Sequence, residues 1–200
     1  MPWEDLERTG LWQQHGYSPV SALDMVRALG RVTDSDAQVL TPRPRSNSNW
    51  SLSDIFGYDQ FPWHTDGALS VNPPRYVAML LVNSDGSCVP TELLDLGVKP
   101  DISSALRRAV LVGTDKQGRK RYLRASEVSD SVRMYRWDPR CCKPTRDREL
   151  VERIDLAPPT SSIDWEVGKL VVFDNWRFLH RRPPVPEGSV REIWRCYVRA

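Results

Sequence analysis

The chain has 200 residues, a length typical of one domain with a single core. Hydrophobic residues make up 40% and charged residues 27%, as in ordinary globular proteins, and a formal net charge of +2 does not indicate nucleic-acid binding. The sequence contains no apolar run of about 18 residues and starts without a secretory pattern, so we expect a cytoplasmic protein that binds no membrane.

The four cysteines are Cys88, Cys141, Cys142 and Cys196. They form no C-x-x-C pattern, which argues against a zinc site. Adjacent cysteines rarely bridge each other, so we expect reduced thiols, in keeping with a cytoplasmic location.

The first predicted element is a helix that starts at Ser18-Pro19 and ends at Gly30, with apolar residues at helical spacing. The next segment, 41–53, is rich in Pro, Ser and Asn and is predicted to be a loop. Loops of this length often serve as lids, so residues 46–53 together with Tyr58 are candidates for a cover over a substrate.

Most of the remaining pattern predicts strands. Apolar runs or alternation indicate strands over 75–82, 109–113, 120–124, 132–137, 168–173 and 192–199, and a short charged helix over 146–153. A turn at 115–118 joins the second and third of these strands into a hairpin. Short strands and hairpins favour a mainly β fold, either a barrel or a double-sheet jelly roll, with helices outside it.

One short segment carries chemistry. His64 and Asp66 lie two residues apart in Phe61–Gly67 (FPWHTDG), so on an extended backbone both side chains point to the same side. His180, one of only three histidines, follows the predicted strand 168–173 and can come from a neighbouring strand. Two histidines and one carboxylate on one face of a metal leave open positions, as in non-haem Fe(II) oxygenases.

Each of these residues also has an ordinary explanation. A histidine beside aromatic residues is often a hydrogen-bonded structural group, and Asp66 before Gly67 is a common turn pair. From the three residues alone the metal site and the structural explanation are about equally well supported.

Spacing beyond the ligands favours the metal site. The stretches 61–82, 90–92 and 168–198 resemble the TauD/TfdA-like (clavaminate synthase-like) family of Fe(II)- and 2-oxoglutarate-dependent dioxygenases. Members of that family have a threonine about 25 residues after the aspartate and an arginine about 11 after the second histidine. Thr91 and Arg191 lie 25 residues after Asp66 and 11 after His180.

The resemblance implies a fold and a set of roles. It implies a double-stranded β-helix (jelly roll, cupin-like) with flanking helices, as one domain over 1–200. Within it we expect an N-terminal helix and cover loop over 1–60 and the jelly-roll core over 61–200. It also implies that His64, Asp66 and His180 hold Fe(II), and that Thr91 and Arg191 bind 2-oxoglutarate, with O2 as the oxidant.

Further residues are weaker candidates for the pocket. Arg191 and Arg195 share one face of the closing strand, and arginines inside a barrel need anionic partners. Arg195 therefore reaches either 2-oxoglutarate or an anionic substrate, a role for which Arg181 and Arg182 are rivals. Trp63 and Asn175 flank the ligands and are further candidates for substrate binding.

The expected function is oxidation, most simply hydroxylation, of an unactivated C–H bond in a small anionic or amino-acid-like molecule of specialised metabolism, with release of succinate and CO2. Two alternatives stay open: a non-catalytic module that binds metal and 2-oxoglutarate, which the short chain favours, and a zinc hydrolase. The sequence does not identify the substrate or say whether a carrier protein tethers it. It also leaves open whether the protein forms a homo-oligomer and what residues 93–164 do.

Overall fold

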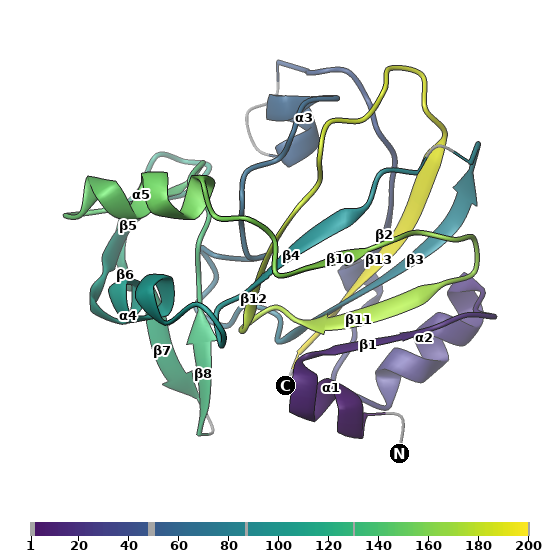
Figure 1. The fold of residues 1–200 in the computed structure, drawn as a ribbon, viewed down its shortest axis with the longest axis horizontal. Coiled ribbons are helices and arrows are strands. Elements are labelled where there is room, and N and C mark those ends of the chain that lie inside the picture. The colour runs from purple at the N-terminus through teal and green to yellow at the C-terminus, as the bar shows by residue number, and fades with distance from the viewer. Residues whose placement is uncertain (1–2, 48–50, 87, 130, 200) are drawn as a thin grey trace.

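Five antiparallel strands form the main sheet of the computed structural model, which describes residues 3–47, 51–86, 88–129 and 131–199. Their order is β1-β11-β3-β13-β2. Their bounds are Leu11–Gln14 (β1), Leu170–Asp174 (β11), Tyr76–Ser84 (β3), Arg191–Val198 (β13) and Ala37–Leu40 (β2). The two longest strands, β3 and β13, pair near the centre of the sheet, and the N-terminal strands β1 and β2 form its two edges (Figure 1).

A second antiparallel sheet of three strands packs against the main one. Its order is β10-β4-β12, with bounds Ser161–Ile163 (β10), Thr91–Asp95 (β4) and Phe178–Arg181 (β12). Alternate side chains of β3, including Val77 and Leu81, pack with Leu93 of β4 and Phe178 of β12 between the sheets. Figure 1 shows the small sheet on one side of the main sheet and α1 and α2 on the other.

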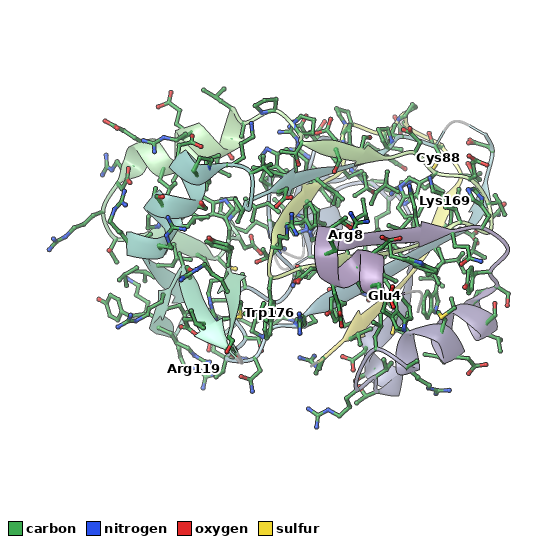
Figure 2. The ribbon with its side chains drawn as sticks, turned by 60° about the horizontal axis from the view of Figure 1, so that its bottom comes forward. Glu4, Arg8, Cys88, Arg119, Lys169 and Trp176 are labelled. Carbon is green, nitrogen blue, oxygen red and sulfur yellow. The ribbon has the colours of Figure 1, made fainter. Side chains whose placement is uncertain are left out.

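Two helices cover the outer face of the main sheet: α1 (Glu4–Thr9) and α2 (Pro19–Arg27). Ser18 caps α2, because its side chain accepts a hydrogen bond from the backbone N–H of Ser21. Ala22 and Val26 of α2 pack on the β3 face opposite to the one that meets the small sheet. Helix α1 buries only Leu6 and leaves Glu4 and Arg8 exposed (Figure 2).

A side lobe extends from the small sheet and is built by residues 100–155 (Figure 1). Its elements are α4 (Pro100–Arg108), β5 (Val110–Thr114), β6 (Lys120–Arg124), β7 (Ser126–Ser129), β8 (Val132–Tyr135), β9 (Cys142–Pro144) and α5 (Arg148–Asp155). Apolar residues of α4 and α5 pack with Trp63, Leu94 and Leu179 in one cluster. The lobe therefore supports the two segments that carry His64 and His180.

The predicted architecture is confirmed, since two facing antiparallel sheets have helices outside them. The hairpin of β5 and β6, the capped helix α2 and the strands β3, β11 and β13 lie where the pattern places them. The predicted strand 132–137 ends earlier, at Tyr135, and the charged helix is α5, which buries Leu150 and Ile154.

Two predictions need correction. The loop predicted over 41–53 ends in a short helix, α3 (Leu52–Phe56), which Ser51 caps by accepting from the Asp54 N–H; residues 48–50 lie outside the described residues. The division at residue 60 is also wrong as a boundary of the core, because β1 and β2 are strands of the main sheet. Short strands with only four residues each gave too little pattern to be recognised.

No helix in the described ranges has both the length and the apolar character needed to span a lipid bilayer.

Candidate metal and co-substrate site

Each residue of the segment His64-Thr65-Asp66 is held by a different partner. His64 N donates to His180 O at 3.1 Å and His180 N donates to His64 O at 2.9 Å, which forms an isolated antiparallel bridge. Thr65 N donates to Trp137 O at 2.7 Å, while Thr65 Oγ1 accepts from Trp137 N at 3.0 Å. This segment is therefore fixed between β12 and the side lobe, although it forms no long strand.

The turn after Asp66 depends on a glycine. Gly67 has φ of 70°, a conformation that L side chains rarely adopt, and an added Cβ would lie 2.9 Å from Pro74 Cδ. Asp66 and Gly67 thus form a turn, which is the structural role that the sequence also suggests for this pair. The turn also directs the Asp66 side chain to the histidines.

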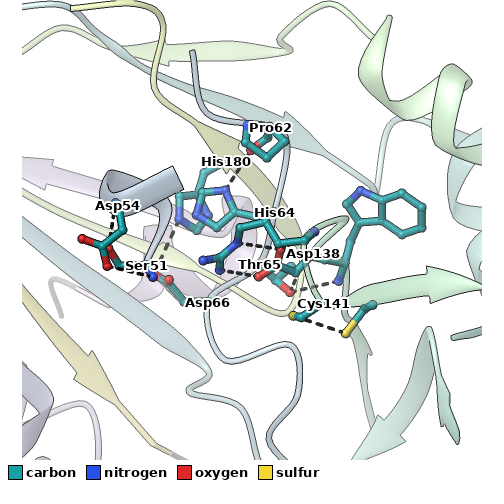
Figure 3. Close-up of polar contacts among 12 residues, drawn as sticks. Ser51, Asp54, Pro62, His64, Thr65, Asp66, Asp138, Cys141 and His180 are labelled. Carbon is teal, nitrogen blue, oxygen red and sulfur yellow. Dashed lines mark hydrogen bonds and ion pairs between the residues drawn. The ribbon is translucent and has the colours of Figure 1, made fainter. Parts of the chain in front are cut away.

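The side chains of His64, Asp66 and His180 converge (Figure 3). Each offers a ligand atom, and these atoms lie within 4.8 Å of one another. The two imidazole ring centroids are 4.1 Å apart, and His180 Nε2 lies 3.5 Å from Asp66 Oδ2. His64 Nδ1 donates to Pro62 O at 2.9 Å, which leaves His64 Nε2 as the unprotonated nitrogen that can bind a metal.

The charge states suit a cation. Burial, and then the neighbouring His180, lower the pKa of His64 to about 3, so this imidazole is neutral at pH 7. Burial alone would raise the pKa of Asp66, but Arg195 and the hydrogen bond from His180 outweigh it and hold this pKa below its usual range. A neutral imidazole and an ionised carboxylate are the forms that ligate a metal.

The donor set fits iron. Two imidazoles and one carboxylate, all buried, occupy one side of a common point, which is the facial arrangement of non-haem Fe(II) sites. A structural zinc site would have four closed ligands, and only three groups meet here among the described residues. The arrangement can hold a divalent cation and leave positions for other ligands.

A hollow of about 420 Å³ lies over these three residues, and Arg191 and Thr91 line it. Arg191 Nη2 donates to Thr91 Oγ1 at 3.3 Å, and Arg191 Nε contacts Cys88 Sγ at 3.3 Å. Arg191 makes no ion pair with a carboxylate in the part of the chain that the structure describes, and burial lowers its pKa. A buried guanidinium without a carboxylate is a ready site for an anion.

Arg195 also lines the hollow but already faces a carboxylate. Arg195 Nη1 lies 3.4 and 3.5 Å from the two oxygens of Asp66, and its guanidinium lies 4.6 Å from the centroid of the Tyr197 ring. Burial, and then the charge of Asp66, raise the pKa of Tyr197, so its hydroxyl stays protonated and donates to Asp66. Arg195 and Tyr197 thus orient the carboxylate of Asp66.

Other arginines surround the hollow. Arg181 pairs with Glu92 and Arg140 pairs with Asp138, whereas Arg182 donates to the carbonyls of Gly57 and Asp59. Arg181 and Arg182 both line the hollow, although neighbouring residues of a strand point to opposite faces. The reason is that β12 ends at Arg181, so the strand alternation stops there.

Two predicted substrate residues have other positions. Trp63 is fully buried; its Nε1 donates to Ala157 O at 3.2 Å, and the guanidinium of Arg181 lies 4.2 Å from the ring centroid. Asn175 is also fully buried and bonds to the backbone of Asp66. Neither lines the hollow, so both are corrected from substrate contacts to structural positions. Of the predicted cover, Ser51 to Ser53 line the hollow and Tyr58 does not.

Sequence reasoning missed several participants. Trp137, which holds Thr65, comes from the region 93–164 whose role the sequence leaves undecided. Trp165, whose Nε1 donates to Thr91 Oγ1 at 3.1 Å, directly follows that region. No spacing rule connects either tryptophan to the ligands, so only the fold identifies them. Tyr197, two residues after Arg195 on the same strand face, could have been found by alternation.

The chain matches one family model and a number of solved structures. The family model described as taurine catabolism dioxygenase TauD, TfdA family, matches residues 107–197. No curated protein sequence gives a significant match.

Solved structures match over nearly the whole chain. An asparagine oxygenase in complex with Fe(II), 2S,3S-3-hydroxyasparagine and succinate is 16% identical, with TM-score 0.72, over 95% of this chain and 74% of that one. The non-heme iron oxygenase OrfP in complex with (3S)-hydroxy-L-Arg is 18% identical, with TM-score 0.72, over 98% and 77%. A taurine dioxygenase from Burkholderia xenovorans is 15% identical, with TM-score 0.71, over 98% and 78%. At these identities the likeness establishes the shared fold.

Proposed function

Since the chain is TauD/TfdA-like in its matched family model and in its fold, we propose that it is an Fe(II)- and 2-oxoglutarate-dependent oxygenase. The observation that carries the proposal is the convergence of His64, Asp66 and His180 beneath a hollow that also contains the guanidinium of Arg191, which has no carboxylate partner among the described residues. A metal triad alone fits many reactions, but a triad beside a buried anion site fits a metal-chelating co-substrate with a second carboxylate.

The residues have distinct roles in this proposal. His64, Asp66 and His180 hold Fe(II), with Pro62 O and Arg195 fixing the orientation of the first two. Arg191 and Thr91 bind the distal carboxylate of 2-oxoglutarate, the guanidinium by an ion pair with hydrogen bonds and the hydroxyl by donating one hydrogen bond. When bound, the metal and co-substrate supply the oxidising chemistry with O2, in which 2-oxoglutarate becomes succinate and CO2.

The protein's own contribution is position and exclusion of water. Burial of the three ligands and of Arg191 keeps bulk water from the reacting groups. Ser51 to Ser53 at the start of α3 and residues 38–43 also line the hollow, and we assign them to the orientation of the substrate. No proton transfer by a side chain is needed for the substrate C–H to be oxidised, so no general base is assigned.

The proposed substrate is a small anionic or amino-acid-like molecule. Six arginines line the hollow, and Asp66 is the single carboxylate that lines it among the described residues. Four of these arginines pair with carboxylates, whereas Arg182 and Arg191 have none within the described ranges. Asp66 is committed to the metal, so a substrate with an anionic group is favoured over a purely cationic one. The hydroxylated amino acids bound to the asparagine oxygenase and to OrfP support the same size class.

The test is 2-oxoglutarate turnover by the purified chain. We expect succinate formation that requires Fe(II), and that increases when the right substrate is added. A panel of matched pairs, each an acid and its neutral amide, tests the charge preference: the acids are expected to stimulate turnover more. Binding of 2-oxoglutarate without any turnover across the panel would instead support the non-catalytic module.

A further inference from the structure

Asn175 lies in the turn between β11 and β12 and is fully buried. Its Oδ1 accepts from the backbone N of Asp66 at 2.8 Å, and its Nδ2 donates to the backbone O of Asp66 at 3.0 Å. The same Nδ2 donates to Pro74 O at 2.9 Å. The amide therefore uses its acceptor and both of its donors, and two of the three hydrogen bonds join it to the backbone of Asp66.

This pair of bonds continues a ladder that the backbone begins. His64 and His180 exchange two backbone hydrogen bonds. If this pairing continued as a strand ladder, the backbone N–H and C=O of Asp66, two residues further on, would bond to a backbone partner. The side-chain amide of Asn175 presents the same donor and acceptor as a peptide group, so it takes the place of that partner. Consequently the turn that leads into the strand of His180 also fixes the backbone of Asp66.

The arrangement needs an amide. An aspartate at position 175 would accept from the N–H of Asp66 but would face two carbonyl oxygens, of Asp66 and Pro74, without a proton to donate. An apolar residue would leave the buried N–H and C=O of Asp66 without partners. Asn175 does not line the hollow, so it acts on the site only through Asp66.

We propose that Asn175 is a positioning residue for the metal: its amide holds the peptide of Asp66 so that the carboxylate stands beside the two imidazoles before any metal binds. The proposal rests on the proposed function only in requiring that this triad binds a divalent cation. It concerns the geometry of the metal-free protein, and it predicts that loss of the amide weakens metal binding without changing any ligand.

The experiment compares Asn175→Asp with the control Trp176→Phe in the full chain. Trp176 is the next residue, and its Nε1 donates to Pro73 O at 3.2 Å, so the control removes one buried hydrogen bond to the same proline segment without touching Asp66. Mn(II) is the probe, titrated under electron paramagnetic resonance, which counts free Mn(II). Thermal unfolding of both metal-free variants measures the structural cost of each change.

We expect Asn175→Asp to bind Mn(II) about 10- to 100-fold more weakly than the parent protein, as is typical when a group that orients a ligand is lost. Trp176→Phe should lose thermal stability but keep the parent Mn(II) affinity. Equal Mn(II) affinity in Asn175→Asp and the parent overturns the proposal, as does an equal loss of affinity in both variants.

Two measurements keep the outcome decisive. If Asn175→Asp does not fold, Asn175→Ser takes its place; its hydroxyl is too short to serve both backbone groups, so weaker Mn(II) binding is again expected and parent-like binding overturns the proposal. In the metal-free parent protein, amide exchange at Asp66 should be slow, and fast exchange would contradict the proposal. If the parent protein binds no Mn(II), the proposed metal site fails, whatever the exchange at Asp66 shows.

Discussion

The backbones of His64 and His180 form a two-way bridge, with N to O distances of 3.1 and 2.9 Å, although these residues are far apart in the sequence. Residues that pair in this way place their side chains on the same face. The spacing of the two imidazoles is therefore set by backbone hydrogen bonds and by the packing of the side lobe beneath them.

Removing one imidazole is expected to abolish metal-dependent turnover. In His180→Ala or His64→Ala, Fe(II)-dependent succinate formation should fall at least about 100-fold, since even changes behind a ligand cost 10- to 100-fold. The assay is succinate formation at fixed Fe(II). His15→Ala is the matched control. His15 is half-exposed, and its 3.8 Å contact is with Glu166 and not with the triad, so this variant should keep parent activity. Comparable losses in all three variants would argue against the triad.

Arg191 should determine the affinity for 2-oxoglutarate. Arg191→Met removes the buried cation while keeping an apolar stem, so the KM for 2-oxoglutarate should rise roughly 10- to 100-fold, corresponding to about 1.5–3 kcal/mol for hydrogen bonds to a charged group. Steady-state kinetics at varied 2-oxoglutarate measures this change. Arg177→Met is the control, because Arg177 pairs with Asp95 outside the hollow; it should cost stability and leave this KM unchanged.

Thr91 should have a smaller effect of the same kind. Its hydroxyl carries no charge and donates one hydrogen bond, so Thr91→Val is expected to raise the KM for 2-oxoglutarate by only about 2- to 10-fold, from about 0.5–1.5 kcal/mol. The same kinetic assay applies. A larger effect for Thr91→Val than for Arg191→Met would reverse the assignment of the main anion contact.

Part of this site could be predicted from the sequence because its signals are local or regularly spaced. His64 and Asp66 share a face through the two-residue period, and Arg191 shares one with Arg195 in the same way. Strands β3 and β11 carry long apolar runs, and such runs predict buried strands. These features depend on neighbours in the chain, and the structure agrees with them.

The remainder depends on contacts between distant residues. Helix α4 contains Ile102 and Leu106 on one buried side, but it lies in a stretch whose other residues gave no clear period. The partners Trp137 and Asn175 lie 72 and 109 residues from those that they hold, and no local pattern encodes such pairs. The prediction that Trp63 contacts the substrate is wrong, because its neighbour His64 lines the hollow whereas the Trp63 ring packs in the side-lobe core.

The C-terminal strand is tied to η1 (Asp34–Asp36) by a pH-sensitive contact. Burial would raise the pKa of Asp36, but hydrogen bonds from Thr33 and the charge of Arg199 outweigh it and lower this pKa. A carboxyl group whose pKa is lower in the folded state stabilises the fold above its unfolded pKa of about 4, and loses this effect as the pH falls through the folded value.

Asp36→Asn is therefore expected to lower the free energy of unfolding by about 1–3 kcal/mol at pH 7, with the difference shrinking below pH of about 4. Urea unfolding at several pH values measures it. Asp24→Asn is the control, because Asp24 is exposed and lies 3.5 Å from Arg27, a surface pair with little effect on stability. If the stability difference between Asp36→Asn and the parent protein does not change with pH, the ionised carboxylate of Asp36 is not the source of the stabilisation.

The most direct test of the central claim is an anaerobic titration of the protein with Fe(II) and 2-oxoglutarate, followed by visible absorbance. The triad and Arg191 together predict a weak charge-transfer band that appears only when both are present, and that is lost in His180→Ala. Folded parent protein that shows no such band at saturating Fe(II) and 2-oxoglutarate would contradict the proposed function.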